Sequence, residues 1–136
     1  MPQLTSDRDT VRRPDGDYEY PMEANTIGYA GAIACINASG RLTRGTTATT
    51  LKSVGVFSAR ADNSTGAAGA IKGKVRRGTF RFNNSASTDQ ITLADVGSNC
   101  FVVDDNTVAK TNGSNTRSVA GMVADVDADG VWVRFP

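Results

Sequence analysis

Histidine is absent from this chain of 136 residues, and cysteine occurs only twice. Without histidine the sequence lacks the commonest general base, the commonest zinc ligand and every Ser–His or Cys–His nucleophile pair. Two thiols cannot make a zinc site without other ligands. We also find no pair of carboxylates in a predicted buried setting, and no serine, lysine or tyrosine with a partner pattern. The sequence therefore predicts neither an enzyme nor a cofactor.

The two cysteines lie inside apolar runs, Cys35 in AIACI and Cys100 in CFVV. We expect two reduced thiols in the core, because free cysteine behaves as a small hydrophobic side chain. A disulfide between them would require neighbouring strands, and nothing else in the sequence indicates an oxidising compartment.

Long apolar runs are missing as well. No stretch reaches the roughly 18 residues that a transmembrane helix needs, and the N-terminus MPQLTSDRDTVRR has no hydrophobic signal region. We therefore expect a protein that is made and kept in the cytosol and has no membrane partner. The formal net charge is +1, so the chain as a whole is not a polyanion binder.

The residues that are abundant favour strands and turns. Small apolar residues, mostly Ala and Val, occur with many Gly, Thr, Ser and Asn, whereas Leu and the aromatics are scarce. Short apolar runs follow one another at regular spacing between Gly and Asn turns. The sequence predicts a mainly β fold for residues 26–136, a small antiparallel β-barrel or sandwich. At most one short helix is expected, capped by Thr92 and stopped at Gly97.

Residues 1–25 differ from the rest of the chain. They hold six acidic residues against three arginines, and Pro2, Pro14 and Pro21 interrupt regular structure. Such a stretch cannot bury enough apolar surface to fold alone. It is either a disordered tail or an extended arm that orders on a partner, with both tyrosine rings of Tyr-x-Tyr on one side as anchors. The candidate contact residues of this arm are Leu4, Val11, Arg12, Arg13, Tyr18 and Tyr20.

Two further strands are expected early in the domain, at Ile27–Ile36 and Lys52–Arg60, with a loop at residues 61–70. Within Ile27–Ile36 one face carries bulky side chains and the other is nearly bare, with Gly28 and three alanines. A bare face lets another element approach closely.

The segment Ile71–Asn83 predicts a third strand, and it is strongly basic. Its side-chain parity changes after Gly78, which indicates a bulge at Arg77–Gly78. The basic face is either a solvated edge or a docking face for an acidic protein surface. Binding of nucleic acid is the alternative, with Phe80 and Phe82 as a stacking platform, although their parity places both rings on the apolar face. The candidate contact residues here are Lys72, Lys74, Arg76, Arg77 and Arg81.

The last clear pattern is VAGMVADVDADGVWVRF at Val119–Phe135. Asp129-Gly130 between two apolar runs predicts a hairpin turn. Asp125, Asp127 and Asp129 also resemble the start of an EF-hand loop, but Pro136 occupies the position of the required Glu. The three aspartates therefore remain weak candidates for a metal site. Trp132 points away from the neighbouring apolar side chains, which indicates an oligomer interface or a second packed layer.

Four stretches in this order resemble the small capsid cement, or head decoration, proteins of tailed bacteriophages. They are GYAGAIACINASGRLTRG, VGVFSARADNSTGAAGAIKGKVRRG, TLADVGSNCFVVDDNTV and AGMVADVDADGVWVRF. The resemblance covers Ile27–Phe135, about four fifths of the chain, and does not extend to the N-terminal arm.

This resemblance implies a β-barrel-like domain that binds the outside of an assembled head, often as a homotrimer, and clamps neighbouring subunits of the major capsid protein. Its location would be the outer capsid surface of the virion, after synthesis in the host cytoplasm. A terminal arm that lies across the shell is common in such proteins. The partners expected from the resemblance are thus the major capsid protein and further copies of the chain, and the alternative is a small β-barrel that binds nucleic acid through residues 72–81.

Overall fold

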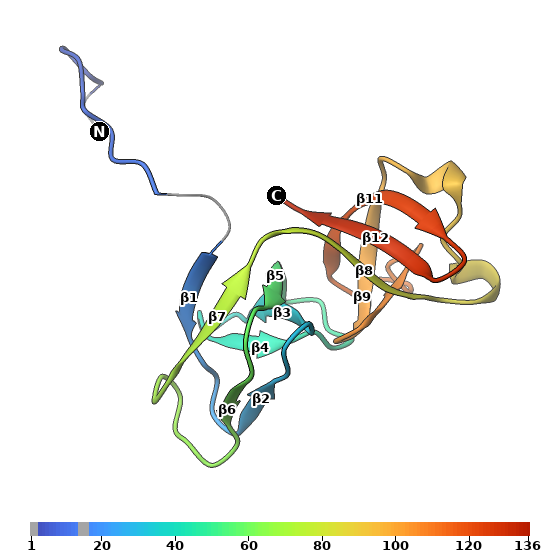
Figure 1. Ribbon diagram of the computed structural model, residues 1–136, viewed down its shortest axis with the longest axis horizontal. Coiled ribbons are helices and arrows are strands. Elements are labelled where there is room, and N and C mark those ends of the chain that lie inside the picture. Colours follow the sequence, from blue (N-terminus) through green and yellow to red (C-terminus); the bar gives the residue numbers. More distant parts are fainter. Residues whose placement is uncertain (1–2, 14–16) are drawn as a thin grey trace.

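The computed structural model describes residues 3–13 and 17–136 and is mainly β, as the sequence predicts. Two curled β units lie side by side, and residues 3–13 lead away from both (Figure 1). None of the helices in the described residues is long and apolar enough to cross a membrane. The strands of the first unit are β1 (Asp17–Pro21), β2 (Thr26–Gly28), β3 (Ile33–Ile36), β4 (Leu42–Arg44), β5 (Lys52–Phe57), β6 (Ala61–Asn63) and β7 (Lys72–Arg76).

The first unit is a five-stranded sheet in the order β1-β7-β5-β3-β4, with β2 and β6 as a separate pair. The chain that leaves β1 crosses to the opposite edge, where Met22 pairs in parallel with Leu42. There the N–H of Glu23 donates to the carbonyl oxygen of Leu42 at 2.8 Å. The sheet thus curls almost into a second barrel around the fully buried Met22.

The second unit is a closed barrel in the order β10-β8-β12-β11-β9. Its pairs are antiparallel, as predicted, except for the parallel pair of β8 and β10. Its strands are β8 (Gly78–Asn84), β9 (Asn99–Asp104), β10 (Thr107–Ala109), β11 (Val119–Asp127) and β12 (Gly130–Phe135).

Two short 3-10 turns, Ser87–Asp89 and Leu93–Asp95, lie in the connection between β8 and β9. The second is the predicted helical turn. The N–H of Thr92 donates to Oδ2 of Asp95 at 2.8 Å, and Gly97 follows with φ +90°.

The predicted bulge at Arg77–Gly78 is the point where the chain leaves the first sheet and enters the barrel. Gly78 has φ +150°, and the strand parity changes there because β7 and β8 belong to different units. Phe82 is buried and Phe80 packs against the same core, so both rings lie on the apolar face as their parity predicts.

The single strand predicted at Ile27–Ile36 is wrong, because the chain turns at Gly31, with φ +87°, and forms β2 and β3 instead. The predicted loop at 61–70 likewise contains β6, which pairs with β2. The close approach predicted for the bare face is confirmed at Gly28, where a Cβ atom would overlap the ring of Phe57.

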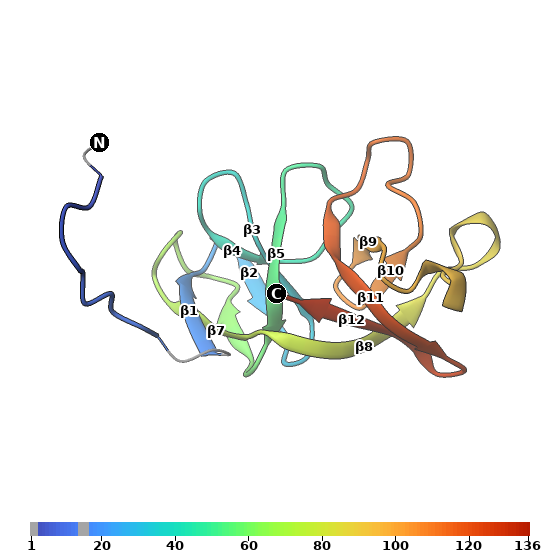
Figure 2. The same ribbon diagram turned by 90° about the horizontal axis from the view of Figure 1, so that it is seen from above.

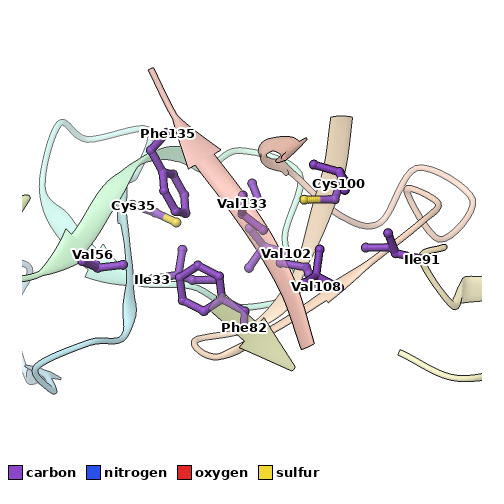
Figure 3. Packing of buried hydrophobic residues seen from close by; sticks show 13 residues of the cluster. Ile33, Cys35, Val56, Phe82, Ile91, Cys100, Val102, Val108, Val133 and Phe135 are labelled. Atoms are coloured by element: carbon purple, nitrogen blue, oxygen red, sulfur yellow. The ribbon is translucent and has the colours of Figure 1, made fainter. Parts of the chain in front are cut away.

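The two units have separate cores that share β3 and β5. Ile33 and Cys35 of β3 point into the barrel core (Figure 3), whereas Ala34 belongs to the core of the first sheet. In β5, Val56 joins the barrel core and Phe57 the other. The barrel core consists of Ile33, Cys35, Val56, Phe82, Ile91, Cys100, Val102, Val108, Ala120, Val123, Val131, Val133 and Phe135, and the sheet core of Met22, Ala32, Ala34, Leu42, Phe57, Ala61 and Val75.

Both cysteines are free and buried in the barrel core, which confirms the prediction of two core thiols. They come from β3 and β9, which are not neighbours in either sheet. Burial raises the pKa of each thiol to about 11, so both stay protonated and unreactive near neutral pH.

The predicted boundary between arm and domain at residue 25 is wrong. β1 pairs with β7 over Asp17–Pro21, and Met22 is a core residue. Residues 17–25 therefore belong to the folded body, and the exposed N-terminal segment described by the structure is residues 3–13.

The hairpin of β11 and β12 forms where predicted, but its two-residue turn is Ala128-Asp129, and Gly130 is already paired with Asp127. Gly130 has φ +152°, and a Cβ atom there would clash with the carbonyl oxygen of Phe82 in β8. The glycine is thus required by the close approach of two barrel strands.

Gly130→Ala should lower the free energy of unfolding by about 2 kcal/mol or more, because the new methyl group meets backbone and the positive φ is strained. Gly40→Ala is the matched control. Gly40 also has a positive φ (+77°) but has open space around it, and its substitution should cost only about 1 kcal/mol. Urea unfolding measures both, and equal losses would contradict the close-packing argument.

Candidate functional site

The N-terminal segment, residues 3–13, is exposed along its whole described length. Leu4 and Val11 are 73% and 91% exposed, although they are the large aliphatic side chains of the segment. Only at the end of the segment does a side chain approach the body, where the guanidinium of Arg13 lies 5.7 Å from the ring centre of Tyr18. Large apolar side chains exposed in this way are available to a partner surface.

The two tyrosines of β1 lie on one side, as predicted, with ring centres 6.3 Å apart and an angle of 11° between the planes. Both are half-buried, because Arg77 covers them. Its guanidinium lies 4.7 Å from the ring centre of Tyr18, and its Nη2 donates to the hydroxyl of Tyr20 at 3.4 Å. Nη1 donates to the carbonyl oxygen of Pro136 at 2.9 Å. We call Tyr18, Tyr20, Arg77 and Pro136 the seam, because they join the first sheet to the end of the barrel.

The seam corrects the interpretation of Tyr18 and Tyr20 as anchors for a partner and of Arg77 as part of a docking face. These side chains are occupied within the chain and fix β1 against the barrel. The seam therefore fixes β1 against the end of the barrel, while Leu4 and Val11 of the N-terminal segment remain exposed.

Acids of the same chain lie opposite two of the three basic residues of β7. Lys72, Lys74 and Arg76 are exposed, as predicted, but β1 sets Glu19 opposite Lys74 and Asp17 opposite Arg76. Nε of Arg76 lies 3.1 Å from Oδ1 of Asp17. This pairing was not predicted, although the alternation of acid and tyrosine in DYEY matches the alternation of apolar or small and basic residues in GKVR, residues 73–76.

Arg81 lies in a third environment, beside the hairpin of β11 and β12. Its guanidinium is 5.7 Å from the ring centre of Trp132 and 3.8 Å from Oδ2 of Asp129. The five basic residues predicted as one docking face thus divide among β7, the seam and the hairpin. With Phe80 and Phe82 packed inward, the predicted stacking platform for nucleic acid does not form.

An open hollow of about 630 Å³ lies between Arg13 and β7. Arg13, Lys72 and Lys74 line it together with Asp17 and Glu19. Its mixture of charges suits a protein surface with both signs better than a phosphate backbone, which carries one sign.

The three aspartates of the hairpin serve the turn. Oδ1 of Asp127 accepts from the N–H groups of Asp129 at 2.8 Å and Gly130 at 3.1 Å, and its Oδ2 accepts from Nε1 of Trp132 at 2.8 Å. Oδ1 of Asp125 accepts from the N–H of Val126. Within residues 3–13 and 17–136 no group of three His, Cys, Asp or Glu side chains is placed to hold a metal ion. The weak metal hypothesis at Asp125, Asp127 and Asp129 gains no support.

Trp132 is half-buried on the outer side of the barrel, away from Val131 and Val133, as its parity predicts. Its indole N–H donates to Asp127, and the guanidinium of Arg81 lies over one face of its ring. A role of Trp132 in an oligomer interface remains a prediction.

Comparisons of the chain with protein-family models, with curated proteins and with solved structures found no match. We therefore infer the function of this chain from its fold and its local chemistry.

Arg77→Lys should lower the free energy of unfolding by about 1–2 kcal/mol, because a lysine cannot stack on Tyr18 and bond both Tyr20 and Pro136. Arg76→Lys is the matched control one position away. Its exposed ion pair with Asp17 is worth little, so the change should stay within about 0.5 kcal/mol. Urea unfolding of both variants tests the seam, and a neutral Arg77→Lys would show that it does not stabilise the fold.

The hydrogen bond from Trp132, followed by those from the N–H groups of Asp129 and Gly130, holds the pKa of Asp127 below its usual value. A lowered pKa contributes stability above the unfolded pKa of about 4, and this contribution is lost as the pH falls through the folded value. Asp127→Asn should therefore destabilise the protein at neutral pH and reduce the loss of stability on acidification. Fluorescence of Trp132, the single tryptophan, follows urea unfolding at each pH, and parallel acid profiles for both proteins would contradict this role.

Proposed function

We propose that this chain is a structural cement protein, which binds the outer surface of a phage capsid and joins neighbouring subunits of the major capsid protein. The observation that carries the proposal is the exposed N-terminal segment, with Leu4 and Val11 uncovered, at the edge of a rigid β body. The four stretches that resemble head decoration proteins support the same function, and so does the absence of a catalytic set in the sequence.

In this function the N-terminal segment orders on the shell while the β body stays unchanged. Ordering an extended segment costs conformational entropy, which burial of Leu4 and Val11 and main-chain pairing along a shell edge offset. Arg12 and Arg13 add contacts to acidic groups of the shell. Many identical contacts on a lattice add through multivalency, so that each single contact need not be strong.

The mixed-charge hollow beside β7 is a second contact of the proposed function. Lys72 and Lys74 reach solvent there although acids of β1 lie opposite, so they bind a surface that offers its own acidic groups. Assembly of copies into a trimer, with Trp132 near their contact, and a place on the outside of the virion belong to the same proposal. The alternative of a nucleic-acid-binding barrel is less favoured, because Asp17 and Glu19 lie beside its basic face and Phe80 and Phe82 pack against the core.

Deletion of residues 1–13 should weaken binding to undecorated heads of the source phage by about a hundredfold. The reason is the loss of two buried aliphatic side chains, worth about 3 kcal/mol after ordering costs. Deletion of residues 1–25 is unsuitable, because it removes β1 and the core residue Met22. Co-sedimentation with heads, at increasing protein concentration, measures the affinity.

The combined variant Lys72→Glu and Lys74→Glu serves as the comparison within the same assay. It should weaken binding less than the deletion does, because the hollow is the second contact. Undiminished binding of the deletion variant would remove the role of the N-terminal segment. Failure of the intact protein to bind heads, together with retention of single-stranded DNA at low salt, would replace the proposed function by the alternative.

A further inference from the structure

A groove of about 560 Å³ lies between the loop before β5 and the start of β11. Leu51, Val119 and Met122 give it apolar walls, and Val119 and Met122 are 43% and 44% exposed. Leu51 packs partly against the barrel core, whereas Val119 and Met122 are left uncovered. The groove is thus an unoccupied apolar surface on the barrel, and Pro136 of the seam lies at its edge.

The rim of the groove is cationic. Lys52 and Arg117 line it, and Arg134 of β12 lies opposite Met122 on the same outer face. Arg117 is held by Asp89, with 3.3 Å between Nη1 and Oδ2. Within the part of the chain that the structure describes, Lys52 and Arg134 form no ion pair. Two such grooves would repel each other, so the complementary occupant carries negative charge and a small apolar tip.

The chain itself carries such a feature at the other end of β11. The tip of the hairpin, residues 125–129, exposes three aspartates around Ala128, and Arg81 is the cation paired with it. The hydrogen bonds of Asp127 to Asp129, Gly130 and Trp132 fix its shape. A rigid tip loses little conformational entropy on docking.

The tip of one molecule cannot reach its own groove. Val119 lies at the groove and Asp127 at the tip, and the eight steps of β11 between them span roughly 25 Å at about 3.3 Å per residue. Figure 2 shows the tip and the start of β11 at opposite ends of the hairpin. Contact between the two features therefore requires two molecules.

We propose that copies of this chain associate head to tail, with the acidic hairpin tip of one molecule in the cationic groove of the next. Asp125 and Asp129 face Lys52 and Arg134, and Ala128 meets Val119 and Met122. The contact is heterologous, because different surfaces of the two molecules meet, so it closes into a ring or continues as a chain. It concerns the free protein in solution and does not depend on binding to a capsid.

Two charge-reversal variants of the full chain test this contact. The groove variant combines Lys52→Glu with Arg134→Glu, and the tip variant combines Asp125→Lys with Asp129→Lys. A contact of this modest size is weak, so the protein concentration should be high, roughly 10–200 µM. Sedimentation velocity in this range should show self-association of the parent protein. Each variant alone should associate at least tenfold more weakly. An equimolar mixture should restore association well above either variant alone. The groove variant still carries a native tip and the tip variant still carries a native groove, so the two can bind each other.

The single variants distinguish a heterologous contact from a symmetric one, because a contact between two identical grooves would survive in the tip variant and a contact between two identical tips would survive in the groove variant. Asp9→Lys in the N-terminal segment is the control, since it reverses an exposed acid outside the tip. It should leave association unchanged. Raising the salt from 0.05 to about 1 M should weaken association, because the Debye length falls to about 3 Å.

Circular dichroism and Trp132 fluorescence establish that each variant is folded, and the neutral pair Lys52→Gln and Asp125→Asn replaces any variant that is not. A parent protein that stays monomeric throughout would overturn the proposal. So would dissociation by Asp9→Lys with no effect of the tip variant, since the occupant of the groove would then be the N-terminal segment. A head-binding defect without a change in solution association would bear on the proposed function alone.

Discussion

The packing of β3 and β5 between two cores is the constraint on which the rest of the structure depends. Ile33, Cys35 and Val56 fill the barrel core, while Ala34 and Phe57 fill the core of the first sheet. A strand buried on both faces cannot alternate apolar and polar residues, which explains the continuous run AIACI. Because the two cores meet at these strands, loss of packing in one removes the support of the other, and we expect the body to unfold as one unit.

The seam extends this coupling to the ends of the chain. β1 is the edge strand of its sheet. Its tyrosines would be exposed there without Arg77, which stacks on Tyr18 and is itself held by Pro136. Arg77 sits at the corner between β7 and β8, so the side chain that bonds both units comes from the residue where the chain passes from one to the other. An arginine suits this position, because its planar group stacks on a ring while its nitrogens donate in different directions. β1 is consequently fixed against the end of the barrel.

Sequence patterns predicted the elements whose signals are local. The parity of Phe80 and Phe82, the break at Arg77–Gly78, the capped turn at Thr92 and the hairpin near Gly130 each depend on a few neighbouring residues, and each is found. The errors concern pairing over long distances. The sequence does not show that β1 lies beside β7, so its local pattern predicts an arm for an acidic strand and a free face for a basic one. The local pattern likewise predicts a turn at Gly130 and does not show its contact with Phe82, which lies 48 positions away.

The pairing of β1 with β7 also makes β7, the most charged strand, a weaker candidate for the main docking surface. Once Asp17 and Glu19 lie opposite Arg76 and Lys74, β7 contributes a mixed surface, and its desolvation by a partner would have to break contacts that already exist. Side chains with uncovered apolar area and no such cost are better docking elements. These are Leu4 and Val11 in the N-terminal segment and Val119 and Met122 in the groove. The charged strand β7 thus helps to hold its own sheet together, and the proposed contacts depend first on the apolar surfaces that no internal partner covers, with the hollow beside β7 as a secondary contact.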